Sequence, residues 1–177
     1  MTQIVNKLDY LIRNNQKKYN LMKNQTISIS DEEYNELYIR IATIKSIEYA
    51  TFSSEYALDF SAESGLTVYT AAVNEAKTKV IMREVPSKLV PANTAVVLHG
   101  AAGNYTGIII ASADTLTNNE LQIATENMSG AGNNIFVLNK KDGVVGFYKL
   151  SKTGTLDKGK AYIPADTDNS SMNMSEE

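Results

Sequence analysis

The sequence predicts a mainly β protein, in which an N-terminal helical hairpin or stalk precedes an antiparallel β-sandwich or small barrel. Three observations predict it. Apolar residues recur at helical spacing before residue 46, short β-branched and aromatic runs alternate with turn residues from Ile47 onward, and periodicity is lost after Ala165. We therefore expect a helical region at 1–46, a β-domain at 47–166 and a flexible acidic tail at 167–177.

The first predicted helix covers residues 3–23. Ile4, Leu8 and Leu11 follow the four-then-three spacing of a coiled-coil seam, and Asn15 stands at the next seam position. A helix of this length is marginal alone in water, so it needs a partner. Two partners stay open at this point: further copies of the chain, or the second helix. A seam Asn favours a dimer, but a trimer fits the short seam as well.

The second predicted helix runs from Ser30 to about Lys45. Ser30 and Glu33 have the spacing of a capping box. In this motif the Ser30 side chain accepts a hydrogen bond from the Glu33 amide, and the Glu33 side chain accepts one from the Ser30 amide. An apolar stripe then follows at helical spacing. Together, the residues predicted to oligomerise the chain or anchor it to a larger assembly are Ile4, Leu8, Leu11, Tyr34, Leu37, Ile41 and Ile44.

The predicted β-domain consists of short strands separated by turn residues, which is typical of sandwiches and small barrels. Residues 140–143 (KKDG) predict a β-hairpin turn, because Asp-Gly tolerates positive φ. Pro86 and Pro91 bracket a short edge segment, and 112–133 predicts a long, weakly specified connection. The strands are expected at 47–53, 56–60, 66–73, 77–85, 94–99, 105–111, 135–139, 144–150 and 161–163.

Composition limits the chemistry that the chain can carry. The 177 residues have a formal net charge of −3 and no cysteine, which excludes disulfides and thiolate metal sites and disfavours nucleic acid as the main partner. No apolar run approaches the length of a membrane span, so we expect no membrane insertion. Residues 1–29 are basic and residues 165–177 acidic, which indicates either separate docking partners or plain solvation.

Candidate catalytic and metal-binding residues are few. His99 is the single histidine, so a two-His metal site is impossible and a structural role is favoured. Residues 166–169 (DTDN) resemble a calcium loop but lack its central Gly and closing Glu. Residues 100–103 (GAAG) lack the Lys-Ser/Thr and helix of a phosphate loop. We predict no catalytic, cofactor-binding or metal residue and no enzyme activity, although paired carboxylates for glycoside hydrolysis stay open.

Four segments in order resemble a β-module of large surface and secreted proteins of Bacteroidetes gut bacteria. They are 57–73 (ALDFSAESGLTVYTAAV), 90–106 (VPANT at 90–94 and VVLHGAAGNYT at 96–106), 133–150 (NNIFVLNKKDGVVGFYKL) and 158–166 (KGKAYIPAD). Asn93 stands where that pattern usually has Gly. The resemblance covers about residues 47–166 and implies a sandwich-like accessory module without catalytic residues.

The layout of a short helical head before a β-domain is similar to head-fibre or capsid-decoration proteins of crAss-like phages. This similarity implies a non-enzymatic virion protein, made in the host cytoplasm and exposed on the capsid surface. Its expected partners are a capsid protein, further copies of the chain as a dimer or trimer, and a cell-surface glycan. The alternative is an accessory β-module of a bacterial surface or secreted protein, located at the cell surface. Virions that lack the chain would contradict the first hypothesis.

Overall fold

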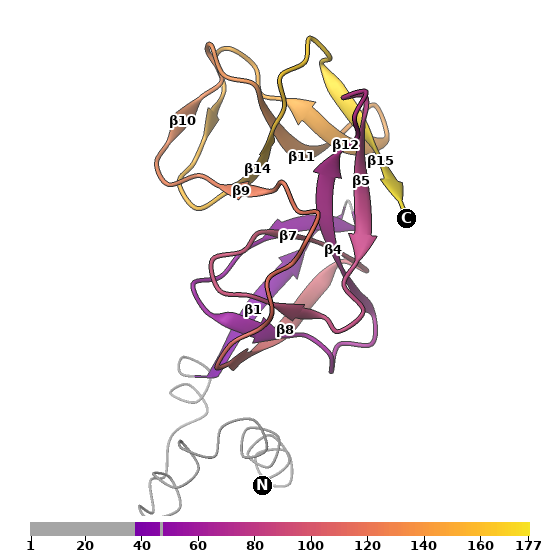
Figure 1. Cartoon of the computed structure of the whole chain (residues 1–177), viewed down its shortest axis with the longest axis vertical. Coiled ribbons are helices and arrows are strands. Elements are labelled where there is room, and N and C mark those ends of the chain that lie inside the picture. Colours follow the sequence, from indigo (N-terminus) through magenta and orange to yellow (C-terminus); the bar gives the residue numbers. More distant parts are fainter. Residues whose placement is uncertain (1–37, 47) are drawn as a thin grey trace, which may run out of the picture.

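The computed structural model describes residues 38–46 and 48–177, and in the described part the regular elements are strands joined by turns and loops (Figure 1). The strands are β1 (Ile39–Ile44), β2 (Tyr49–Phe52), β3 (Ala57–Asp59), β4 (Leu66–Val73), β5 (Lys79–Glu84), β6 (Leu89–Val90), β7 (Val96–Gly100), β8 (Gly103–Ile110), β9 (Gln122–Ile123), β10 (Met128–Ser129), β11 (Ile135–Lys141), β12 (Val144–Lys149), β13 (Thr155–Leu156), β14 (Ala161–Pro164) and β15 (Ser171–Glu176). The prediction of a mainly β protein is confirmed.

The strands form two larger sheets and one small ribbon. A four-stranded sheet has the order β1-β8-β3-β6, and a curled nine-stranded sheet has the order β2-β7-β4-β5-β15-β12-β11-β14-β9. Strands β10 and β13 pair separately. Most pairs are antiparallel as predicted, but β15 runs parallel to β5. The architecture is sandwich-like where the four-stranded sheet covers part of the larger one.

Two lobes share the nine-stranded sheet (Figure 1). The N-terminal lobe encloses a core between the four-stranded sheet and β2, β7 and β4, with Leu58, Phe60 and Leu98 at its centre. The C-terminal lobe encloses a second core inside the curl of the large sheet, with Phe136, Phe147 and Met172 fully buried. Strands β4 and β7 are buried on both faces, because Val68 and Leu98 point into the first core while Tyr69 and Val97 point into the second.

The first described strand corrects the helical prediction. Residues 39–44 form β1, which pairs with β8 along its whole length from Ile39 opposite Ile108 to Ile44 opposite Gly103. The predicted helix over 30–45 is therefore wrong at this strand, and the β-domain begins before Ile47. The physical reason is β-branching: Ile and Thr fill four of the six positions of IRIATI and suit a pleated surface. The predicted helix at 3–23 and residues 30–37 lie outside the described residues.

The C-terminal segment corrects a second prediction. Residues 171–176 form β15, which lies between β5 and β12, whereas the sequence predicted a flexible tail from residue 167. The link before β15 is held by Lys77 Nζ, which donates to the Asp166 carbonyl at 3.0 Å, and by Lys149 Nζ, which donates to the Thr167 carbonyl at 3.0 Å. Asn169 Nδ2 donates to the Lys77 carbonyl at 2.8 Å. These bonds satisfy polar groups that would otherwise favour a solvated tail.

The end of β15 is fixed by charged and phenolic groups. The Glu177 carboxylate forms an ion pair with Arg83 at 2.6 Å, and Tyr49 Oη donates to Glu176 Oε1 at 3.3 Å. The Tyr69 side chain is buried, and this desolvation, followed by the charge and hydrogen bonding of Glu176, raises the pKa of Tyr69 to about 12 from its ordinary 10.0. The fold therefore stabilises the neutral phenol of Tyr69 relative to its phenolate.

This shift predicts a loss of stability in alkali. The folded state holds the Tyr69 proton more tightly than the unfolded state, so the stabilisation is complete below pH 10.0 and is lost as the pH rises towards about 12. Tyr69→Phe should reduce the loss of stability in alkali, whereas Tyr56→Phe, at a residue that is 39% exposed, should leave that loss unchanged. Denaturant midpoints measured between pH 9 and 12 test the difference. Equal alkaline slopes for the two variants would contradict the assignment.

Candidate binding site

An open groove of about 1120 Å³ lies on the outer face of β11, β12 and β15. One end is formed by the loop around Gly130–Asn134 and the other by the β11–β12 hairpin at Lys140–Gly143. These strands belong to the C-terminal lobe, at the end of the molecule opposite β1 (Figure 1). The groove is the candidate functional site.

Strand register places the groove's floor residues in two cross-strand rows. Val137 pairs with Tyr148, which pairs with Ser171, and Asn139 pairs with Gly146, which pairs with Asn173. Because side chains alternate between faces, residues next to these in each strand point inward: Phe136, Phe147 and Met172 are buried in the core. The same alternation that builds the core therefore presents an aromatic ring and two amides to solvent.

Tyr148 forms the flat part of the floor. Its hydroxyl donates to the Val144 carbonyl at 2.9 Å, which holds the side chain back along its own strand. A Cβ on Gly146 would lie 3.6 Å from Tyr148 Cε2 and 2.9 Å from the Met172 carbonyl oxygen. Gly146 therefore leaves room for the ring beside a closely approaching β15 backbone. The result is a fixed aromatic surface at the centre of the groove.

The hairpin at one end of the groove was predicted correctly from sequence. Asp142 and Gly143 form a two-residue turn with φ of 52° and 83°, as a type I′ turn requires, and Lys141 pairs with Val144 across it. This tight turn ends both strands together. It presents Lys140, Lys141 and Asp142 at the rim of the groove.

Gly130 fixes the loop at the other end of the groove. Its amide donates to the Gly154 carbonyl at 2.9 Å, and Asn133 Nδ2 donates to the Ser129 carbonyl at 2.7 Å. A Cβ at Gly130 would collide with the backbone carbonyl of Ser151. The loop can hold this position only because residue 130 has no side chain.

Gly130→Ala is therefore expected to lower the free energy of unfolding by about 1–3 kcal/mol, because two backbones must move apart to admit the methyl group. Gly65→Ala is the matched control, since a Cβ there meets nothing within 4 Å. Chemical denaturation of both variants measures the difference. If Gly130→Ala were as stable as Gly65→Ala, the close backbone contact at the groove end would be wrong.

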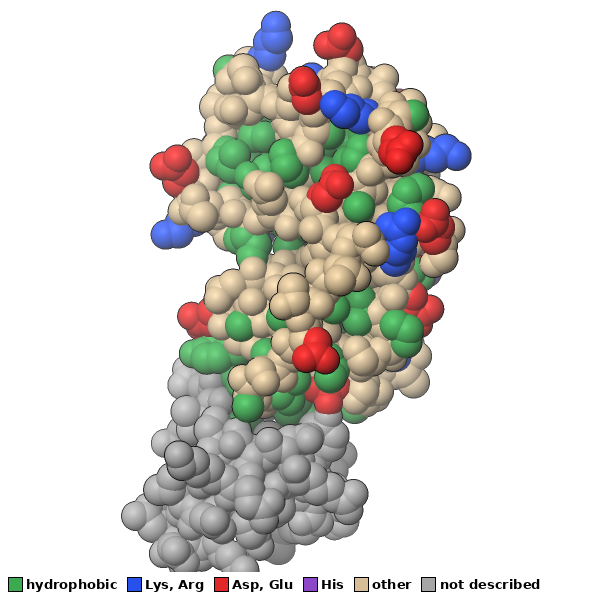
Figure 2. All heavy atoms as spheres, viewed as in Figure 1, with side chains coloured by type: hydrophobic (Ala, Val, Ile, Leu, Met, Phe, Trp, Pro, Cys, Tyr) green, Lys and Arg blue, Asp and Glu red, His purple; other side chains and the backbone are tan. Residues whose placement is uncertain are grey.

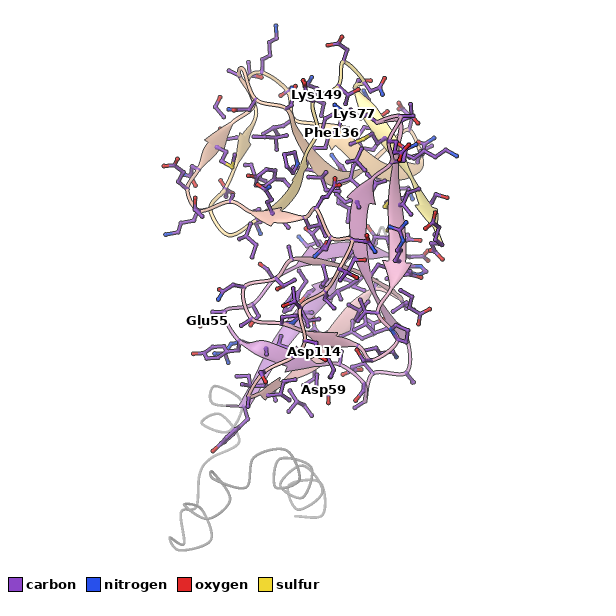
Figure 3. The ribbon with its side chains drawn as sticks, viewed as in Figure 1. Glu55, Asp59, Lys77, Asp114, Phe136 and Lys149 are labelled. Atoms are coloured by element: carbon purple, nitrogen blue, oxygen red, sulfur yellow. The ribbon has the colours of Figure 1, made fainter. Side chains whose placement is uncertain are left out.

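The groove is locally basic in an acidic chain. Residues 38–177 contain 12 Lys and Arg but 15 Asp and Glu, yet four lysines and only two aspartates line the groove. Lys149 is engaged on the inner side, where its Nζ lies 6.0 Å from the Phe136 ring centroid (Figure 3). Within the described part, Lys141 and Lys152 have no ion-pair partner. On the face seen in Figure 2, Lys and Arg side chains lie mostly on the C-terminal lobe, interspersed with Asp and Glu side chains.

The residues predicted to anchor or oligomerise the chain do not belong to this groove. Ile4, Leu8, Leu11, Tyr34 and Leu37 lie outside the described residues. Ile41 and Ile44 lie on β1 and face opposite sides of the sheet, because Ile44 is 1% exposed in the core and Ile41 is 50% exposed. The structure therefore does not bring these two onto one helical face.

His99 and residues 166–169, which were considered above as candidate catalytic or metal-binding groups, have structural roles in the fold. The His99 ring stacks on Tyr49 across the β2–β7 pair, with centroids 4.2 Å apart and an interplanar angle of 12°. In residues 166–169, Asp166 Oδ1 accepts from Asn134 Nδ2 at 3.1 Å and Asn169 binds Lys77 as described above. Among the described residues, no cluster of His, Cys, Asp and Glu could hold a metal ion.

Comparison with protein-family models, with curated proteins and with solved structures gave no match. In the part of the chain that the structure describes, no helix is long and apolar enough to cross a membrane.

Proposed function

We propose that the chain is a non-enzymatic display protein that is anchored through its N-terminal region and presents the groove of its C-terminal lobe to a ligand. The observation that carries this proposal is that the two ends of the described part differ. Residues 1–37 join it at β1, and the groove lies at the other end (Figure 1). An anchor at one end and a binding surface at the other is the arrangement that attachment to a surface requires.

The resemblance noted above gives the proposed setting. We assign the chain to a phage virion, as a short head fibre or capsid decoration, with Ile4, Leu8, Leu11, Tyr34 and Leu37 in the anchoring region. Ile44 stabilises the fold rather than the anchor, and Ile41 remains exposed for contact. Several copies on one particle, each binding its ligand weakly, would act together, since multivalency raises overall avidity without new contacts.

Purified virions test the setting directly. The chain should co-purify with particles through a density gradient and be detected by mass spectrometry at a fixed ratio to the capsid protein. Its presence only in the envelope fraction of a bacterium would favour the second candidate, an accessory module of a bacterial surface protein. That candidate draws on the resemblance over residues 47–166, where Asn93 adopts the positive φ of 54° that a glycine would accept readily.

A further inference from the structure

We infer that the groove over β11, β12 and β15 binds an acidic glycan chain, with Tyr148 as the stacking platform and Lys141 and Lys152 as the carboxylate contacts. This inference rests on the proposed function, because it names the ligand of the same groove. Three properties of the groove lead to it: an immobilised ring, a lining rich in amides and hydroxyls, and rim lysines that have no ion-pair partner among the described residues.

The ring supplies the first contact. The face of a tyrosine ring is electronegative and attracts the C–H groups on one side of a pyranose ring. Tyr148 is prepared for such stacking, because its bond to the Val144 carbonyl fixes the ring before the ligand arrives. Because Gly146 has no side chain, the ring can lie back along its own strand, where a Cβ on residue 146 would be 3.6 Å from Tyr148 Cε2.

The polar lining supplies directional contacts. Sugar hydroxyls both donate and accept, and so do the side chains of Asn and Ser. Asn173, Ser170 and Ser171 line the groove without a side-chain hydrogen bond to the rest of the described chain. Asn139 Oδ1 accepts from the Lys140 amide at 2.8 Å, which fixes that side chain and leaves its amide nitrogen to donate. These groups match a ligand covered with hydroxyls.

The lysines decide the charge of the ligand. Lys141 stands beside Asn139 on the outward face of β11, and Lys152 lies in the turn after β12. Neither has an ion-pair partner among the described residues, and the whole chain has a net charge of −3. A local excess of unpaired cations in an acidic chain favours an anionic ligand over a neutral one.

The shape favours a polymer over a single sugar. The groove is open at the surface and follows strand β11, whose seven residues span roughly 20 Å. A single-stranded nucleic acid would use several stacked aromatic side chains, whereas Tyr148 is the one aromatic residue among the described residues that line this groove. The arrangement therefore fits an internal segment of an acidic polysaccharide better than a nucleic acid.

The test is a titration of the full chain with oligogalacturonate and with its neutral methyl ester, by isothermal titration calorimetry at low salt. We expect the acidic oligomer to bind at least about tenfold more tightly than the ester, and to weaken as ionic strength rises. Lys141→Gln with Lys152→Gln should weaken binding about five- to tenfold. The matched control, Lys158→Gln with Lys160→Gln, changes two exposed lysines of the same lobe outside the groove and should leave binding unchanged.

Tyr148 separates stacking from simple charge attraction. Tyr148→Ala should weaken binding about tenfold, and Tyr148→Phe should weaken it less, because Phe keeps the ring that contacts the sugar and loses only the hydroxyl bond that holds the ring in place. Thermal unfolding of each variant shows that the fold is kept. The inference is overturned if no acidic oligomer binds, if both lysine pairs weaken binding equally, or if an oligodeoxynucleotide of equal charge binds more tightly. A chain present on virions that binds no acidic glycan would remove this ligand and leave the display role standing.

Discussion

Deletion of residues 171–177 is expected to abolish cooperative folding of the C-terminal lobe. Strand β15 separates β5 from β12, so its removal leaves two unpaired edges inside the nine-stranded sheet. It also removes Met172, whose side chain is 0% exposed in the core that contains Phe136 and Phe147. Loss of one buried side chain of this size costs about 2–5 kcal/mol, before the lost ladder is counted. Near-UV circular dichroism and urea denaturation measure the effect.

Point variants on the same strand keep this prediction measurable if the truncated chain does not fold. Met172→Ala should lower the free energy of unfolding by about 2–5 kcal/mol, because the methionine side chain fills the core. Asn173→Ala is the matched control: it faces the groove, and its effect should stay within about 0.5 kcal/mol. A truncated chain with an unchanged denaturation midpoint would mean that the segment is the flexible tail that the sequence suggested.

Ile44→Ala is expected to destabilise the N-terminal lobe by about 2–5 kcal/mol, while Ile41→Ala changes stability by less than about 0.5 kcal/mol. The two residues differ in burial, because Ile44 is 1% exposed and Ile41 is 50% exposed. On strand β1 they face opposite sides of the sheet. Chemical denaturation of the two variants, which make the same chemical change, measures this difference.

The same pair of variants distinguishes the strand from the helix that the sequence pattern suggested. On a helix, Ile41 and Ile44 are three residues apart and share one face, so both substitutions would have similar effects. Equal losses of stability, or equal losses of self-association with stability unchanged, would contradict the strand. The result therefore tests the correction at 39–44 independently of any ligand.

Nine of the strands between β2 and β14 could be predicted from sequence because their signals are local. The Asp142–Gly143 turn is the clearest case, since its residue types define the turn and the turn defines the register of β11 and β12. Strand β1 was missed because Leu37, Ile41 and Ile44 also fit a helical stripe. The density of β-branched residues in IRIATI was the signal that could have decided for a strand.

Strand β15 and the groove could not be predicted because they depend on distant contacts. The segment SMNMSE is polar at four of six positions, and it becomes a strand only where β5 and β12 leave a gap for it. The rows that join Tyr148 to Ser171 and Gly146 to Asn173 exist only after that strand is in place. Hence the hairpin half of the site was visible in the sequence, but the side contributed by β15 was not.

The measurement that tests the display proposal most directly uses the absence of cysteine from the natural sequence. Two single-cysteine variants can be labelled with a bulky maleimide on purified virions. Lys141→Cys places the thiol on the groove rim. Glu55→Cys places it in the N-terminal lobe, at a position where the natural side chain is 72% exposed. Both should react equally fast in the free protein. We expect the Lys141→Cys label to remain fast on the particle and the Glu55→Cys label to slow. Particles without the chain, or a groove that becomes the protected end, would contradict the account.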